Sequence, residues 1–156
     1  GNHRADVLER MVQDTNTLIT FSDAGAHIRN MAFYNLPLRF LKMIKNSHDK
    51  GQPLMSMEKA VWRMTGEQAD WFGVEAGKIR AGDRADIVII NPEKFDQNLE
   101  VVHWGTMENF DLERLVNRNP GLVEHVLING KLAVENEEIS PKLGIEKGYG
   151  RFLPAS

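Results

Sequence analysis

The chain has 156 residues, of which 42% are hydrophobic and 26% are charged, and this composition is typical of a globular protein large enough to bury a core. Its net charge of −3 gives no global field that would attract nucleic acid or an anionic membrane, and no apolar run is long enough to span a bilayer. The absence of cysteine excludes disulfides and thiolate metal sites. We therefore expect a cytoplasmic protein that binds neither nucleic acid nor membrane.

The first third of the chain predicts two helices on either side of one buried strand. Apolar residues recur at helical spacing over residues 5–13 and 32–45, and Pro37 suits the first turn of the second helix. Between them, residues 17–21 carry a short apolar run without alternation, which favours a parallel strand covered on both faces. Such a strand needs neighbours on both edges, and the chain offers no second strand of this kind. The sequence thus indicates a fragment of a larger α/β protein.

Polar residues follow this apolar run at its carboxyl end. Asp23 comes two residues after Phe21, and Gly25 and His27 follow it closely. The carboxyl ends of parallel strands are where α/β enzymes place their chemistry, and glycine lets the backbone approach a ligand or a metal. The alternative is structural, because Ser22 to Gly25 could simply form the turn after the strand.

The middle of the chain predicts two further helices. Ser56 is a good N-cap for a helix whose apolar residues share one face, and Thr65 with Gln68 has the spacing of a capping box. This second, shorter helix is expected to end at Gly73. We interpret the methionine and tryptophan side chains here as packing residues.

The composition becomes that of a β structure after Gly73. We expect two extended pieces over residues 74–92, the second being a core strand over residues 86–91, then a possible strand at 101–104 and one or two helical turns at 111–116. Residues 123–134 read as a hairpin that turns at Asn129-Gly130, the strongest short-range hairpin signal. The glycine-bearing tail from residue 140 predicts a surface loop.

Several stretches in the same order resemble the metal-dependent amidohydrolase superfamily, closest to its branch of N-acyl-D-amino-acid deacylases (D-aminoacylases, the amidohydrolase 3 branch). The Ser-Asp-Ala-Gly-Ala-His run at residues 22–27 resembles the last barrel strand of these enzymes. The remaining matches are the helix pair at 56–73, the return into a small β domain at 77–88, the closing hairpin at 126–130 and the tail at 148–153.

The resemblance implies an α/β fold: the C-terminal fragment of a (β/α)8 TIM barrel followed by part of a small β-sandwich. Residues 1–73 would be the last strand and helices of the barrel, and residues 74–156 the C-terminal part of the sandwich domain. The missing N-terminal barrel portion would then be the main partner of this chain.

The chemistry that the resemblance implies is zinc-dependent hydrolysis of a C–N amide bond in a small-molecule substrate, with N-acyl-D-amino acids as one class. Asp23 matches the carboxylate that touches the metal and moves the proton of the attacking water. The other metal ligands of the family have no counterpart, since no two of the five histidines fall at chelating spacing. A catalytic zinc needs about three protein ligands, so we expect the isolated chain to be inactive and to bind zinc weakly or not at all.

Three residues near Asp23 are candidates for contacting substrate: Gly25, His27 and Arg29. His27 would line the pocket or orient Asp23, or it is a loop histidine bonded to nearby backbone. Arg29 suits a substrate carboxylate, although the deacylases place their arginine further into this loop. By contrast, Asp86 is expected to be structural, as a turn-forming acid at the start of a strand.

A second hypothesis belongs to another class of function: a non-catalytic assembly or interaction module derived from the same fold. The apolar run at 17–21 argues against it, because the strand would be left without neighbours. Either way, we expect the chain to form a homo-oligomer that covers exposed apolar helix faces and strand edges.

Overall fold

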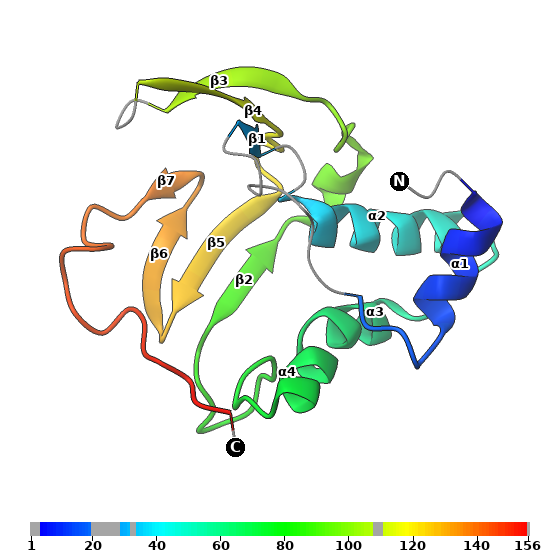
Figure 1. Cartoon of the computed structure of the whole chain (residues 1–156), viewed down its shortest axis with the longest axis horizontal. Helices are drawn as coiled ribbons and strands as arrows, with labels where there is room; N and C mark the ends of the chain where they lie inside the picture. Colours follow the sequence, from blue (N-terminus) through cyan, green and yellow to red (C-terminus); the bar gives the residue numbers. More distant parts are fainter. Residues whose placement is uncertain (1–3, 20–28, 32–33, 108–110, 156) are drawn as a thin grey trace.

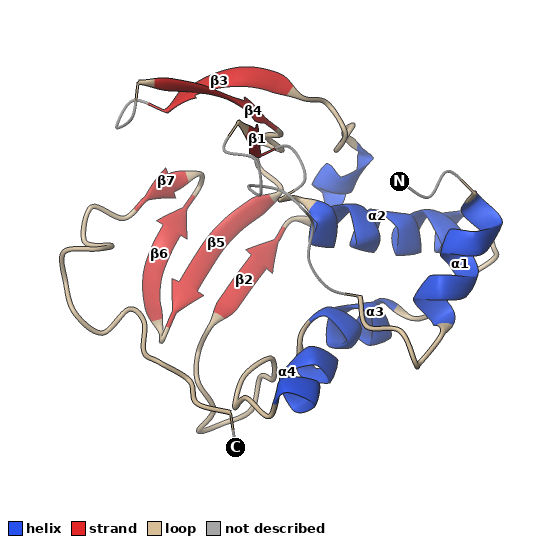
Figure 2. Cartoon of the chain, in the orientation of Figure 1, coloured by secondary structure: helices blue, strands red, loops and turns tan. Residues whose placement is uncertain are grey.

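The computed structural model describes residues 4–19, 29–31, 34–107 and 111–155 (Figure 1). Its architecture is mixed α/β. Figure 2 shows the helices gathered on one side of the molecule and the strands on the other. No helix in these ranges is both long enough and apolar enough to cross a bilayer.

Four α-helices form the helical side: α1 (Ala5–Gln13), α2 (Leu36–Asp49), α3 (Met57–Met64) and α4 (Gly66–Phe72). The predicted helix at 5–13 is confirmed, and Pro37 lies in the first turn of α2 as expected, although α2 begins and ends four residues later than predicted. Ser56 caps α3 by accepting a hydrogen bond from the Lys59 amide at 3.1 Å.

The capping box predicted at Thr65 is wrong. Its hydroxyl donates instead to the carbonyl of Val61 at 2.8 Å, in the preceding helix, and Thr65 makes no side-chain cap for α4. The side chain of Gln68 bonds elsewhere, to the backbone of Ile19. The end of α4 is as predicted, since Gly73 adopts the left-handed conformation (φ 64°) that terminates a helix.

A four-stranded antiparallel sheet is built from β2 (Ile87–Ile90), β5 (Val123–Ile128), β6 (Lys131–Glu135) and β7 (Glu138–Ile139), in that order. Both the core strand after Asp86 and the hairpin are confirmed. Asn129 (φ 52°) and Gly130 (φ 78°) both take positive φ, as a tight two-residue hairpin turn requires. The first extended piece expected before β2 is not a strand.

A second, three-stranded sheet has the order β1-β4-β3, with β1 (Asn30–Met31), β3 (His103–Met107) and β4 (Leu112–Val116). Only the second half of the strand expected over residues 101–104 is confirmed, because β3 begins at His103. The helical turns expected over residues 111–116 are wrong, because this segment pairs antiparallel with β3 along its whole length. The parallel contact in the described ranges is the short one between β1 and β4.

The apolar run after α1 also differs from expectation over the part that is described. Thr17 lies in a bend, and neither Leu18 nor Ile19 belongs to a strand. The rest of the predicted strand, from residue 20, lies outside the described residues. The described ranges therefore contain mixed α/β layers and no closed barrel.

One buried cluster joins the helices to the loops that leave the sheets. Ile44 on α2 and Ala60 on α3 are fully buried, and Leu122, at the start of β5, is fully buried against them. The 3-10 helix Pro92–Asp96 adds Phe95. The cluster comprises Val12, Phe40, Leu41, Ile44, Ala60, Phe95, Leu99 and Leu122. The cluster thus contains residues from both segments, 1–73 and 74–156, into which the sequence analysis divides the chain.

Candidate functional site

A buried arginine holds the segment that leads into the predicted site. Arg63, on α3, has a side chain only 1% exposed and pairs with Glu67 one turn later at 3.0 Å. Its guanidinium also donates to the backbone carbonyls of Val12, Asp14 and Thr17. These carbonyls belong to the end of α1 and to the turn after it, where no helical partner is available. Arg63 therefore fixes the path of the chain immediately before residues 20–28.

Gln68 holds the same segment slightly further along the chain, at Ile19. Its side-chain amide donates to the carbonyl of Ile19 and to that of Arg63. The carbonyls of Thr17 and Ile19 are thus satisfied by side chains on α3 and α4. This explains why the described start of the apolar run is no strand: its carbonyls accept hydrogen bonds from side chains and not from a neighbouring strand.

The other end of the predicted loop is held by a cluster of asparagines. Asn35, which is buried, donates to the carbonyl of Leu99 at 2.7 Å and to the side chains of Asn117 and Asn119. Asn117 in turn donates to the carbonyl of Leu99 at 2.8 Å. The start of α2 is therefore fastened to the end of β4, so both flanks of the loop are anchored by buried polar side chains.

Of the four site residues that the sequence predicts, Asp23, Gly25 and His27 lie outside the described residues. Arg29 is described: it is exposed, and its carbonyl accepts a hydrogen bond from the Leu115 amide at 2.7 Å. The structure therefore brings Arg29 beside β4, and the roles of all four residues stay predictions.

The described residues do not form a metal site. Within residues 4–19, 29–31, 34–107 and 111–155, no three histidine, aspartate or glutamate side chains lie close enough together to hold a metal ion. The ligand set needed for a catalytic zinc, which is about three protein groups, is thus not supplied by this part of the chain.

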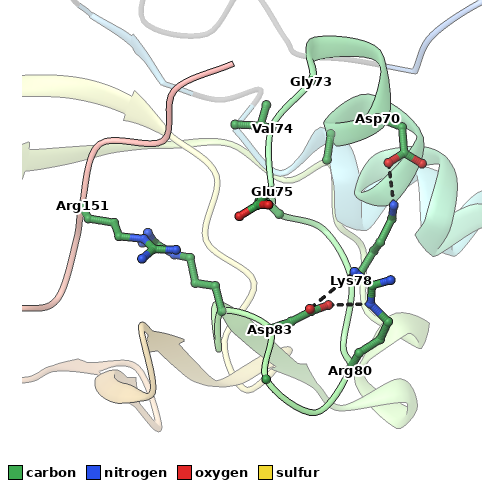
Figure 3. Close-up of a pocket in the computed structure, with 12 residues that line it drawn as sticks. Asp70, Gly73, Val74, Glu75, Lys78, Arg80, Asp83 and Arg151 are labelled. Carbon is green, nitrogen blue, oxygen red and sulfur yellow. Dashed lines mark hydrogen bonds and ion pairs between the residues drawn. The ribbon is translucent and has the colours of Figure 1, made fainter. Parts of the chain in front are cut away.

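A charged cavity lies elsewhere, between the end of α4, the loop before β2 and the C-terminal tail (Figure 3). Its volume is about 550 Å³. Two ion pairs line it: Lys78 with Asp70 at 2.5 Å, and Arg80 with Asp83 at 2.7 Å. The remaining charged residues of the lining are Glu75, Arg84 and Arg151. Reasoning from the sequence missed this cavity, because Arg151 is far from the others in the chain and its tail reads as a plain loop.

Asp86 joins the cavity to the hairpin. One carboxylate oxygen accepts the Asn129 amide at 2.7 Å, and the other accepts the guanidinium of Arg84. Burial alone would raise the pKa of Asp86, but the Asn129 amide and the charges of Arg84 and Arg151 outweigh it and lower that pKa below the ordinary value of 3.8. The structural role expected for Asp86 is confirmed, and its partner is the turn of the hairpin.

Comparison with known proteins gives one fold likeness and a set of longer relatives. No protein-family model matches the chain. Uncharacterized proteins of Mycobacterium tuberculosis and Mycobacterium bovis are 40% identical to it over 152 residues, which is 97% of this chain and 24% of each relative. The chain therefore spans about a quarter of the length of these curated relatives.

Among solved structures, the chain is similar to a crystal structure of D-aminoacylase that defines a subset of amidohydrolases. The likeness has a TM-score of 0.59 and covers 96% of this chain and 28% of that one, at 23% sequence identity. At this identity the likeness shows the fold alone: the backbone of this chain has the arrangement of one part of that structure.

Proposed function

We propose that the chain is the C-terminal part of a zinc-dependent amidohydrolase that hydrolyses a C–N amide bond in a small molecule. The observation that carries the proposal is the likeness to D-aminoacylase over 96% of this chain. The order of the resembling sequence stretches supports it. In this proposal residues 1–73 complete a TIM barrel and residues 74–156 belong to the small β domain, both joined to an N-terminal barrel portion.

Asp23 is the proposed catalytic residue. It would accept a proton from the attacking water and return it to the leaving amine, which is general acid–base work suited to a carboxylate held near a cation. Arg63 and Gln68 support this role because they fix the backbone just before it, through the carbonyls of Thr17 and Ile19. A rigid approach matters, since small misplacement of a catalytic group costs much of the rate.

Gly25, His27 and Arg29 are the proposed substrate contacts. Arg29 is exposed beside β4, and a guanidinium there could pair with the carboxylate of an N-acyl amino acid. N-acyl-D-amino acids are the first substrate class to test, because the similar solved structure is a D-aminoacylase. His27 would line the same pocket.

Zinc is proposed for the whole enzyme and not for this chain alone. The described residues contain no group of three metal-binding side chains and so would not hold the ion by themselves. Asp23 is the one ligand that the chain is proposed to contribute. Isothermal titration of the 156-residue chain with zinc should give weak binding or none, and stoichiometric tight binding would contradict the proposed division of the site.

The activity test uses the full-length gene product that contains this chain. Release of free amine from N-acetyl-D- and N-acetyl-L-amino acids is measured with zinc present. We expect Asp23→Asn to lower kcat by about 100-fold or more, the size of a lost general base. Asp49→Asn is the matched control, because Asp49 lies at the exposed end of α2, where its ion pair among the described residues is with Lys45; it should leave kcat unchanged.

An unchanged kcat in Asp23→Asn would overturn the catalytic assignment.

The second candidate function is a non-catalytic assembly module, and it is favoured by the apolar side chains exposed on β2, Val88 at 54% and Ile89 at 42%. Full-length protein that hydrolyses no N-acyl substrate, yet forms a stable complex through this strand, would select that alternative.

A further inference from the structure

The charged cavity contains a buried arginine whose donors are only partly used. The side chain of Arg84 is 7% exposed, and its Nε donates to Asp86. Its Nη1 is buried and has no hydrogen-bond partner among the residues that the structure describes. A guanidinium offers donors only, and a buried donor without an acceptor is costly. Because Nη1 is closed off from solvent, an acceptor reaches it only when neighbouring side chains move, and a ligand acceptor there would satisfy a donor that is otherwise costly to bury.

Arg151 adds a second guanidinium to the same cavity. It reaches in from the C-terminal tail, opposite the loop that carries Asp83 (Figure 3). Within the described ranges it forms no ion pair, whereas Lys78 and Arg80 are each paired with an aspartate. The charge of Arg151 acts on Asp86, whose pKa it helps to lower, but the hydrogen bonds of Asp86 go to Asn129 and Arg84. One positive charge at this end of the cavity is thus left without a bonded counter-ion.

The acid that remains in the lining limits the charge of any ligand. Glu75 points across the cavity toward Arg151 but forms no ion pair with it (Figure 3). Glu75 repels any anion, but a doubly charged phosphate more strongly than a singly charged carboxylate, which also matches the fork of a guanidinium. The volume of about 550 Å³ is within the usual range for small-molecule sites.

We propose that this cavity binds a small carboxylate anion between the Nη1 of Arg84 and the guanidinium of Arg151. The lining of the cavity includes none of the residues proposed for amide hydrolysis, and this proposal does not rest on that function. Glu75 sets its preference, because it faces the bound anion and disfavours a second negative charge.

The test is an NMR titration of the 156-residue chain that follows the arginine side-chain N–H signals. Sodium acetate and sodium phosphate are added separately, against sodium chloride at equal ionic strength. We expect acetate to shift the Arg84 and Arg151 signals saturably in the millimolar range, with phosphate weaker and chloride without effect. Equal responses to all three salts would mean an adventitious ion only and would overturn the proposal.

Variants separate this site from general electrostatic attraction. Arg151→Gln should weaken acetate binding at least tenfold, whereas Arg118→Gln, an exposed arginine outside the cavity, should leave it unchanged. Glu75→Gln should strengthen phosphate binding more than acetate binding. Arg84→Lys keeps the charge but loses the fork, and we expect about tenfold weaker binding. Acetate affinity that survives Arg151→Gln would overturn the proposal even if the Arg84 variant fails to fold.

Discussion

Arg63 shows what a single buried charge does in this molecule. Its guanidinium serves three backbone carbonyls and the carboxylate of Glu67 at once. Arg63→Met keeps much of the volume but leaves those acceptors and Glu67 without a donor. Since breaking a buried pair by removing one partner typically costs about 3–5 kcal/mol, we expect a loss of about that size in the free energy of unfolding, measured by urea denaturation.

The control for this prediction is Arg80→Gln. Arg80 also pairs with a carboxylate, that of Asp83, but its side chain is 68% exposed. Exposed pairs contribute about 0–1 kcal/mol, so this variant should unfold close to wild type. Similar losses in both variants would show that the buried carbonyl contacts of Arg63 do not stabilise the fold.

Asp86 gives a prediction that depends on pH. Its pKa is lowered in the folded chain, so the stability that it contributes is fully present above the unfolded value of about 3.9 and is lost as the pH falls through the lower folded pKa. Asp86→Asn keeps an acceptor for the Asn129 amide but removes the charge and the second acceptor that face Arg84, so it should cost about 1 kcal/mol at pH 7, the size of one hydrogen bond. The difference in Tm from wild type should shrink by pH 3, and a constant difference from pH 7 to pH 2 would contradict the assignment.

At the scale of elements, the joint between α3 and α4 depends on a glycine from another segment. Gly77 has φ +72°, and a Cβ there would lie 2.6 Å from the carbonyl oxygen of Thr65 and 2.8 Å from the Gly66 nitrogen. Gly77→Ala must therefore move backbone atoms in addition to straining φ. We expect it to lower the free energy of unfolding by clearly more than the 1–2 kcal/mol of a left-handed alanine alone.

Gly82→Ala is the matched comparison, because Gly82 also has positive φ (+91°) but a Cβ there would meet nothing within 4 Å. The difference between the two variants, measured by urea denaturation, isolates the contact with the joint. Two equal losses would mean that Gly77 matters only for its own backbone conformation.

Elements with a local cause were predictable from the sequence, and those with a distant cause were not. The turn at Asn129-Gly130 is set by two residues that tolerate positive φ, so the hairpin could be read directly. Residues 111–116 were misread because their strand is fixed by pairing with β3. The start of the apolar run was misread for a similar reason, since the side chains of Arg63 and Gln68, distant in the sequence, donate hydrogen bonds to its backbone carbonyls.

At the scale of the whole molecule, the sequence predicts the catalytic candidate, and the structure describes the anchors of the segments before and after it in the chain. Asp23 follows from a pattern of residues near each other in the chain. The anchors on either side, Arg63 and Asn35, bond to residues roughly 46 to 84 positions away, and no spacing rule connects them. The cavity lined by Arg84 and Arg151 was missed on the same grounds.

Self-association through β2 is the prediction that concerns the molecule as a whole. In the described part of the chain, β2 is an edge strand whose outer side pairs with nothing, and Val88 is 54% exposed on it. Such edges invite pairing with another chain. We expect the average mass from light scattering to rise with concentration, and Val88→Lys to reduce this rise, because a charged side chain blunts an edge strand.

Ile145→Lys is the control, since Ile145 is 82% exposed in the tail and lies on no strand. It introduces the same charge without touching the edge of β2, so the concentration dependence should stay as in wild type. A wild-type chain that is monomeric at all concentrations would contradict the expected homo-oligomer. An equal reduction in both variants would show that net charge controls the association, because only a contact through the edge strand distinguishes the two positions.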